Sequence, residues 1–125
     1  MYDDSRLDDI LGEIKKSYIT AYQDKLCEVI LYGSYARGDQ NPESDIDVVA
    51  IVNDNRLNVQ NALKQVWKDA ADIGLEHDVI VSPLAIPLSE YQEYQDVYLL
   101  YKKIRDEGVI IYPASYKKEF CKEVT

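Results

Sequence analysis

Two short apolar runs, residues 27–32 and 45–52, leave few choices for the centre of the fold. Both are rich in β-branched residues and too short for an ordinary helix, so each predicts a strand buried in a sheet. A polar segment that contains glycine and proline separates them, which predicts a turn and a loop. The second run opens with Asp45 and Asp47, although carboxylates are seldom buried in a strand.

The rest of the chain supplies helices and further strands around this pair. Apolar residues at spacings of three and four predict amphipathic helices in three segments: 7–22, 56–73 and 91–107. Two more segments predict short strands: 76–81 and 109–112. Pro83 and Pro87 predict that no strand continues through them. This order predicts one α/β (α+β) domain over 1–125, in which helices flank a small mixed β-sheet.

The charge of the chain narrows the class of its partners. The formal net charge is −9 at pH 7, so most of the surface should repel a phosphate backbone. Direct nucleic-acid binding is therefore disfavoured. A small nucleotide with metal-neutralised phosphates, or a protein with a basic face, is compatible with this charge.

Other compositional features point to a cytoplasmic protein. No apolar run approaches the roughly 20 residues that a membrane span needs. The acidic N-terminus lacks the apolar stretch of a signal peptide. Cys27 and Cys121 match no metal-binding spacing, so we expect reduced thiols.

Asp45 and Asp47 are the first candidate functional residues. Side chains alternate along a strand, so residues two apart point to the same face. Two adjacent carboxylates repel each other, and a divalent cation such as Mg²⁺ removes that cost. The alternative is a solvated strand end without a metal.

Asp78 extends this hypothesis to a third carboxylate. It lies near the start of the predicted strand 76–81. If that strand pairs beside the second one, the three carboxylates converge and can hold two metal ions suited to displacement at phosphorus. The alternative is an exposed acid at the end of a strand.

Gly33 and Ser34 follow the first strand and form a candidate phosphate-binding turn. A glycine here lets the backbone approach a ligand closely, and the following amides can form an anion site. The alternative is a plain turn in which Ser34 caps a helix. Arg37 lies three residues further and can reach a phosphate or pair with Asp39 or a site aspartate.

Two further features favour structural roles. His77, the one histidine, should point away from the face of Asp78. Four tyrosines recur at helical spacing and predict a packing or interface stripe: Tyr91, Tyr94, Tyr98 and Tyr101.

The order and spacing of these elements carry a resemblance to a known family. Gly33-Ser34, ten residues, and then Asp45-x-Asp47 form the pattern Gly-Ser-x10-Asp-x-Asp. The stretch resembles the signature of the DNA polymerase β superfamily of nucleotidyltransferases. Within that superfamily the chain resembles the minimal nucleotidyltransferase (MNT) family. The likeness extends loosely to Asp78 and to residues 102–112.

The resemblance implies a polymerase-β-like fold, two Mg²⁺ ions and transfer of a nucleoside monophosphate from ATP or another nucleoside triphosphate. It implies three metal ligands, of which the last also helps to deprotonate the acceptor: Asp45, Asp47 and Asp78. The predicted nucleotide-binding residues are Gly33, Ser34, Arg37 and Ser44. MNT proteins are often antitoxins paired with HEPN-domain toxins, and some adenylylate a tyrosine of the toxin.

Three functions follow. The leading hypothesis is a protein adenylyltransferase that acts as an antitoxin on a HEPN-type toxin. A second is a non-catalytic, nucleotide-binding antitoxin that works by complex formation. A third is a small-molecule nucleotidyltransferase acting on an antibiotic, which the short chain disfavours because no acceptor domain remains once the core is assigned.

Overall fold

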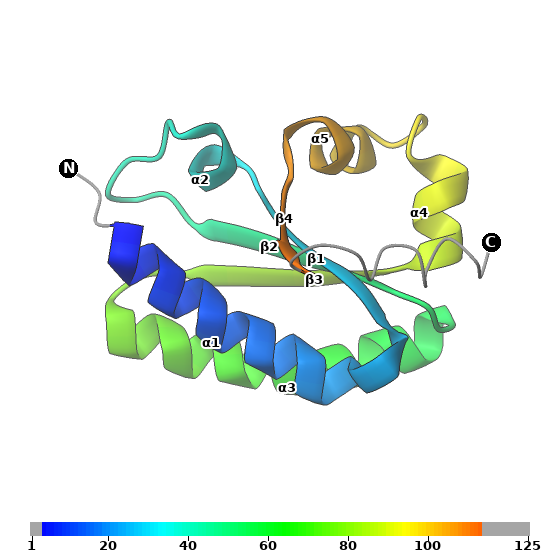
Figure 1. Ribbon diagram of the computed structural model, residues 1–125, viewed down its shortest axis with the longest axis horizontal. Helices are drawn as coiled ribbons and strands as arrows, with labels where there is room; N and C mark the ends of the chain where they lie inside the picture. Colours follow the sequence, from blue (N-terminus) through cyan, green and yellow to red (C-terminus); the bar gives the residue numbers. More distant parts are fainter. Residues whose placement is uncertain (1–3, 114–125) are drawn as a thin grey trace.

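The computed structural model describes residues 4–113, which form a four-stranded sheet covered by helices on both faces (Figure 1). The helices are α1 (Asp4–Tyr22), the short 3₁₀ turn η1 (Gln23–Lys25), α2 (Ser34–Arg37), α3 (Arg56–His77), α4 (Leu88–Tyr94) and α5 (Leu99–Glu107). The strands are β1 (Leu26–Tyr32), β2 (Ile46–Val52), β3 (Val81–Pro87) and β4 (Val109–Tyr112).

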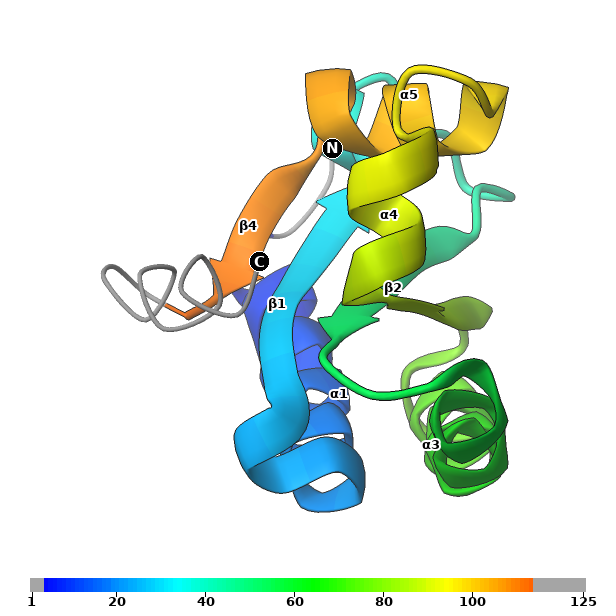
Figure 2. The same cartoon turned by 90° about the vertical axis from the view of Figure 1, so that its right-hand side faces the viewer.

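The sheet has the order β3-β2-β1-β4, so the two apolar runs of the sequence are its two central strands. β1 pairs antiparallel with β2 and β4, whereas β2 and β3 are parallel. Figure 2 shows β4 along the outer side of β1. The predicted mixed sheet flanked by helices is confirmed.

β2 is buried on both faces because each face has its own helical cover. Ile46 and Val48 pack in the core beneath α1 and α3 and are fully buried. Val49 and Ile51 point to the opposite face and pack with residues of α4 and α5. The alternation of side chains along β2 therefore places Asp47, which is in phase with Val49, on the face of α4 and α5.

α1 is tied to the sheet through one buried tyrosine. Ile10, Ile14 and Tyr18 recur every four residues and are fully buried. The Tyr18 hydroxyl donates a hydrogen bond of 2.7 Å to the carbonyl oxygen of Leu84 in β3. Burial raises the pKa of this phenol, so its donor proton stays in place.

The predicted strand at 76–81 is wrong. α3 continues through Gly74 to His77, and the third strand begins only at Val81. The strand also includes Pro83 and Pro87, which we expected to interrupt it. β3 is an edge strand, where a missing backbone N–H costs no ladder bond, and this is why it tolerates prolines.

The predicted helix at 91–107 is two helices, α4 and α5, separated at 95–98. The tyrosines still pack together, but around this break. The ring centroids of Tyr94 and Tyr98 are 5.2 Å apart, and those of Tyr98 and Tyr101 are 5.3 Å apart. Tyr91 joins the cluster through Tyr101, at 5.9 Å. The packing interpretation of the four tyrosines is therefore confirmed, without the single helix.

Two other expectations concern the thiols and the membrane. Cys27 is disulfide-bonded, so the expected reduced thiol is wrong there, while Cys121 lies outside the described residues. The expectation rested on the absence of a metal-binding spacing, which carries no information about disulfide bonding. Within residues 4–113, no helix has the length and apolar character needed to cross a bilayer.

We expect Tyr18→Phe to lower the free energy of unfolding by about 1–2 kcal/mol, because the Leu84 carbonyl loses its buried donor. Urea denaturation followed by circular dichroism measures this change. Tyr98→Phe is the control: its side chain is half exposed, so the effect should stay within about 0.5 kcal/mol. Equal effects of the two substitutions would contradict the role given to the Tyr18 hydroxyl.

Candidate active site

The turn after β1 and the start of β2 meet at one point, where Gly33 faces Asp47. Gly33 has φ +78° and ψ −155°, a conformation open almost only to glycine. A Cβ atom on Gly33 would lie 2.5 Å from the Asp47 Oδ2 atom, which is too close for any real contact. Glycine is therefore required twice, for the backbone conformation and for the approach of the carboxylate. The two halves of the Gly-Ser-x10-Asp-x-Asp pattern touch in the folded chain.

Asp47 is a partly buried carboxylate in an unfavourable electrostatic position. Burial and then the charge of Asp45 raise its pKa, whereas nearby Arg37 lowers it. Because the pKa of this acid is raised on folding, its contribution to stability is present at low pH. That contribution is lost as the pH rises from the ordinary aspartate range through the raised pKa. A bound cation would remove the cost of the ionised form.

Asp45 lies immediately before β2 and is exposed. The fully buried Ile46 separates it from Asp47, as expected for an alternating strand. The charge of Asp45 is the second cause, after burial, of the raised pKa of Asp47. Next to Asp47 on β1, burial and the Asp47 charge raise the pKa of Tyr32 to about 12, so this neighbour is a neutral phenol.

The backbone around Gly33 settles the role of Ser34 in the turn. Gly33, not Ser34, is the N-cap of α2, so the simple capping alternative is wrong. The amides of Ala36 and Arg37 donate to the Gly33 carbonyl at 3.1 Å and begin the helix. Ser34 is thus the first residue of α2, beside the turn that touches Asp47.

Ser44 closes the loop that leads to Asp45. Its Oγ atom accepts the Asn41 N–H at 2.9 Å, and its own amide donates to the Asn41 carbonyl at 3.0 Å. Ser44 therefore fixes the backbone immediately ahead of the first aspartate.

Arg37 is held by two carboxylates. Its Nε atom donates to Asp39 at 3.1 Å and its Nη1 atom to Glu107 at 3.0 Å, and both bonds raise the pKa of the guanidinium. Asp39 was one of the predicted partners of Arg37, whereas Glu107, which is far away along the chain, was not predicted. The close packing of Gly108 against Ile30 of β1 brings the end of α5 to this place.

Asp78 does not occupy the predicted position beside Asp47. It ends α3 in the left-handed conformation, with φ 56° and ψ 50°, and its amide bonds to the Gly74 carbonyl. Aspartate tolerates this conformation better than most residues, so Asp78 serves as a helix terminator. On β3 the residue paired with Asp47 is Ser82. The predicted strand that would bring Asp78 to the other two aspartates is absent because α3 extends to His77, and among the described residues the three carboxylates form no group with ligand atoms all within 4.8 Å.

A different trio of potential metal ligands lies between α1 and α3. Within the described part of the chain, Glu13, Glu76 and His77 are the one such group with ligand atoms all within 4.8 Å. The His77 Nε2 atom lies 2.7 Å from Glu13 Oε2, which agrees with the structural role predicted for this histidine. The sequence offered no signal for the pairing, since Glu13 belongs to another helix.

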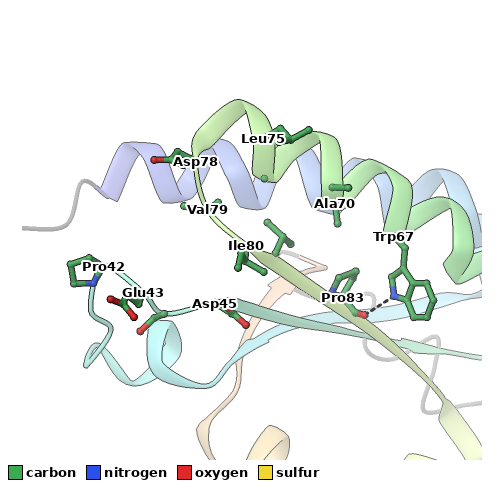
Figure 3. Close-up of a pocket in the computed structure, with 14 residues that line it drawn as sticks. Pro42, Glu43, Asp45, Trp67, Ala70, Leu75, Asp78, Val79, Ile80 and Pro83 are labelled. Carbon is green, nitrogen blue, oxygen red and sulfur yellow. Dashed lines mark hydrogen bonds between the residues drawn. The ribbon is translucent and has the colours of Figure 1, made fainter.

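A groove of about 1010 Å³ opens next to Asp45 (Figure 3). Its walls come from the loop before β2, the second half of α3 and the start of β3. Asp45, Ser44 and Asp78 line it, whereas Gly33 and Asp47 do not. The groove therefore adjoins the turn and the aspartate pair but does not enclose them.

A glycine turn in contact with an Asp-x-Asp pair, on a mixed sheet, is the arrangement expected from the Gly-Ser-x10-Asp-x-Asp pattern. Residues 11–112 match the family described as Nucleotidyltransferase domain, which is most of the chain. The chain belongs to this family and is an enzyme of the nucleotidyltransferase class.

The chain is also similar to individual proteins. It is 40% identical over 76 residues to "Putative protein adenylyltransferase MJ0141" of Methanocaldococcus jannaschii, covering 61% of this chain and 75% of that protein. A crystal structure of a toxin-antitoxin with AMP-PNP contains a similar chain, with a TM-score of 0.54 and 18% identity over 98% of this chain and 85% of that one. The crystal structure of spectinomycin adenyltransferase AAD(9) of Enterococcus faecialis is also similar, with a TM-score of 0.62 and 12% identity. The match covers 90% of this chain and 58% of that one. These two structural likenesses show a shared fold.

We expect Gly33→Ala to weaken binding of Mg²⁺-ATP by at least about tenfold, because the new methyl group displaces the Asp47 carboxylate. Isothermal titration calorimetry measures the affinity. Gly38→Ala is the control: Gly38 also has a positive φ, +82°, but a Cβ there meets nothing within 4 Å. That variant should lose about 1 kcal/mol of stability and keep its affinity. Equal affinities of the two variants would contradict the importance of the Gly33–Asp47 contact.

Proposed function

We propose that this chain is a Mg²⁺-dependent adenylyltransferase that transfers AMP from ATP to a hydroxyl of a protein partner, and that it acts as the antitoxin of a HEPN-type toxin. One observation carries the proposal: the Asp47 carboxylate lies directly against the Gly33 turn. A group that binds phosphate and a group that binds metal must be this close for both to act on one triphosphate.

The aspartate pair fits magnesium better than a softer metal. Its donors are carboxylate oxygens, the hard ligands that Mg²⁺ prefers, and one or two of them suffice alongside water and substrate phosphates. The raised pKa of Asp47 means that its ionised form is disfavoured in the fold, and a bound cation would stabilise that form. When bound, Mg²⁺ neutralises phosphate charge and makes the α-phosphorus more electrophilic. The number of ions, two, rests on the resemblance to the MNT family.

The residues of the chain have separate tasks in this proposal. Asp45 and Asp47 hold the metal, and the turn at Gly33 and Ser34 receives the triphosphate. Arg37, on the last turn of α2, adds positive charge on the same side as Gly33 and exchanges a carboxylate partner for a phosphate oxygen. Ser44 acts through the loop, by fixing the backbone before Asp45.

The reaction is a displacement at the α-phosphorus. A bond forms between the acceptor oxygen and phosphorus, the bond to the bridging oxygen breaks, and pyrophosphate leaves with both electrons of that bond. The hydroxyl proton passes to water. We assign no metal-binding role to Asp78, because it ends a helix ahead of β3 instead of lying opposite Asp47.

Three observations support a protein acceptor. The similar M. jannaschii protein is named a protein adenylyltransferase, and a similar fold occurs in a toxin-antitoxin. The net charge of −9 also suits a basic protein partner. A HEPN-type toxin is the partner that the MNT resemblance implies, and a tyrosine hydroxyl is the acceptor that some members of that family use.

The test is transfer of α-labelled AMP from ATP to the HEPN-type protein with Mg²⁺. We expect Asp45→Asn and Asp47→Asn each to reduce labelling by at least about 100-fold, since metal ligation is worth several kcal/mol at the transition state. Asp78→Asn should retain labelling within about threefold, because asparagine also accepts the left-handed conformation that Asp78 adopts.

Two results would change this account. Loss of labelling in Asp78→Asn as severe as in Asp47→Asn would return Asp78 to the metal site. No labelling by the wild type, with a stable complex that the double variant Asp45→Asn/Asp47→Asn also forms, would favour the second candidate, an antitoxin that works by complex formation alone.

A further inference from the structure

The groove beside Asp45 is not part of the proposed nucleotide-binding turn, because neither Gly33 nor Ser34 lines it. Figure 3 shows Trp67, Ala70 and Leu75 of α3 along one wall. Ile80 and Pro83 line the floor, while Pro42, Glu43 and Asp45 lie across from the helix. The groove thus runs along the edge of the sheet and ends at an aspartate of the proposed metal site.

The apolar side chains of this groove are unusually open to solvent. The exposed fractions are 83% for Leu75, 62% for Ile80 and 55% for Trp67. Large apolar side chains that gather in a concave surface are typical of a site that another molecule covers. All three of these side chains line the same groove.

The position of the groove relative to β2 indicates which reactant uses it. In an in-line displacement the attacking and leaving oxygens lie on opposite sides of phosphorus. The proposed triphosphate site, with Gly33 and Arg37, lies on the β1 side of β2. The other neighbour of β2 is β3, and the groove follows β3. The acceptor hydroxyl should therefore arrive from the side of the groove.

The charges of the groove favour a basic polypeptide. Its acidic residues are Glu43, Asp45 and Asp78, and none of the described residues that line it is basic. Apolar walls with an acidic end complement a segment that carries both apolar and basic side chains. A nucleotide, with its phosphates, fits this charge less well.

The edge of β3 limits how such a segment can bind. The Trp67 Nε1–H donates to the Pro83 carbonyl at 3.1 Å, and the Gln60 side chain donates to the Ala85 carbonyl at 3.3 Å. Pro83 and Pro87 have no N–H to offer. An added strand would find these groups occupied or absent, so the segment must bind through its side chains.

We propose that this groove docks a segment of the acceptor protein, with apolar side chains on Trp67, Leu75 and Ile80 and a basic side chain near Glu43, and so delivers the acceptor hydroxyl to Asp45. The inference rests on the proposed function and adds to it the surface that recognises the partner. Nucleotide binding stays with the Gly33 turn.

The kinetic test uses two leucines of the same helix. Leu75 and Leu57 lie at opposite ends of α3 and are exposed by 83% and 70%, but only Leu75 lines the groove. We expect Leu75→Ser to raise the KM for the HEPN-type protein by about tenfold or more, because a leucine loses its contact with the partner. The KM for ATP should not change. Leu57→Ser should alter neither constant, and equal effects of the two variants would overturn the proposal.

The second test separates this proposal from the proposed function. Trp67 is the one tryptophan of the chain, so its fluorescence reports on the groove directly. The titrants are Mg²⁺-ATP and the HEPN-type protein with its tryptophans replaced by phenylalanine. We expect a blue shift with the protein and none with Mg²⁺-ATP. A shift with Mg²⁺-ATP alone would overturn the proposal by assigning the groove to the nucleobase.

The fluorescence test does not depend on turnover. If the wild type transfers no label, the proposed enzymatic function fails, but a Trp67 shift that Leu75→Ser weakens and Leu57→Ser preserves would still support partner docking in the groove. If label is transferred and Trp67 does not respond to the protein, the enzyme stands and the groove is not its docking site.

Discussion

The contact between Gly33 and Asp47 holds the site together. Without a Cβ atom at residue 33, the chain turns sharply out of β1, and the Asp47 carboxylate of the next strand lies against that turn. Pairing of β1 with β2 fixes the two ends of the contact, since Asp47 is opposite Tyr32. The cost is a partly buried carboxylate whose ionised form is disfavoured. In the proposed function, this contact is where the metal ion and the triphosphate come together.

The central strands β1 and β2 and the glycine turn between them could be predicted because their sequence signals are local. The runs around Val29 and Val49 are apolar on both faces, and a glycine that ends a buried strand marks a turn. Asp78 was predicted in a strand because Gly74 indicated a helix end and residues 76–81 resembled a strand. Both local signals were wrong. Gly74 suggested the end of a helix, yet α3 runs on to His77, where tertiary packing of the helix outweighs the weak propensity of glycine.

Contacts between segments that are far apart along the chain could not be predicted from the sequence. The pairing of Arg37 with Glu107 depends on the packing of Gly108 against Ile30, which no local pattern reveals. The groove depends on the path of α3 across the edge of β3, including the bond from Trp67 to the Pro83 carbonyl. The proposed site therefore has a nucleotide side that one short motif predicts and a proposed docking side that is assembled from α3 and β3.

The most direct measurement is a crystal structure of the chain with a non-hydrolysable ATP analogue and Mn²⁺, which replaces Mg²⁺ and is located by its anomalous scattering. We expect the metal to be bound by the carboxylates of Asp45 and Asp47, with the triphosphate against Gly33 and Ser34. An anomalous peak at Glu13, Glu76 and His77, with none at the aspartate pair, would contradict it.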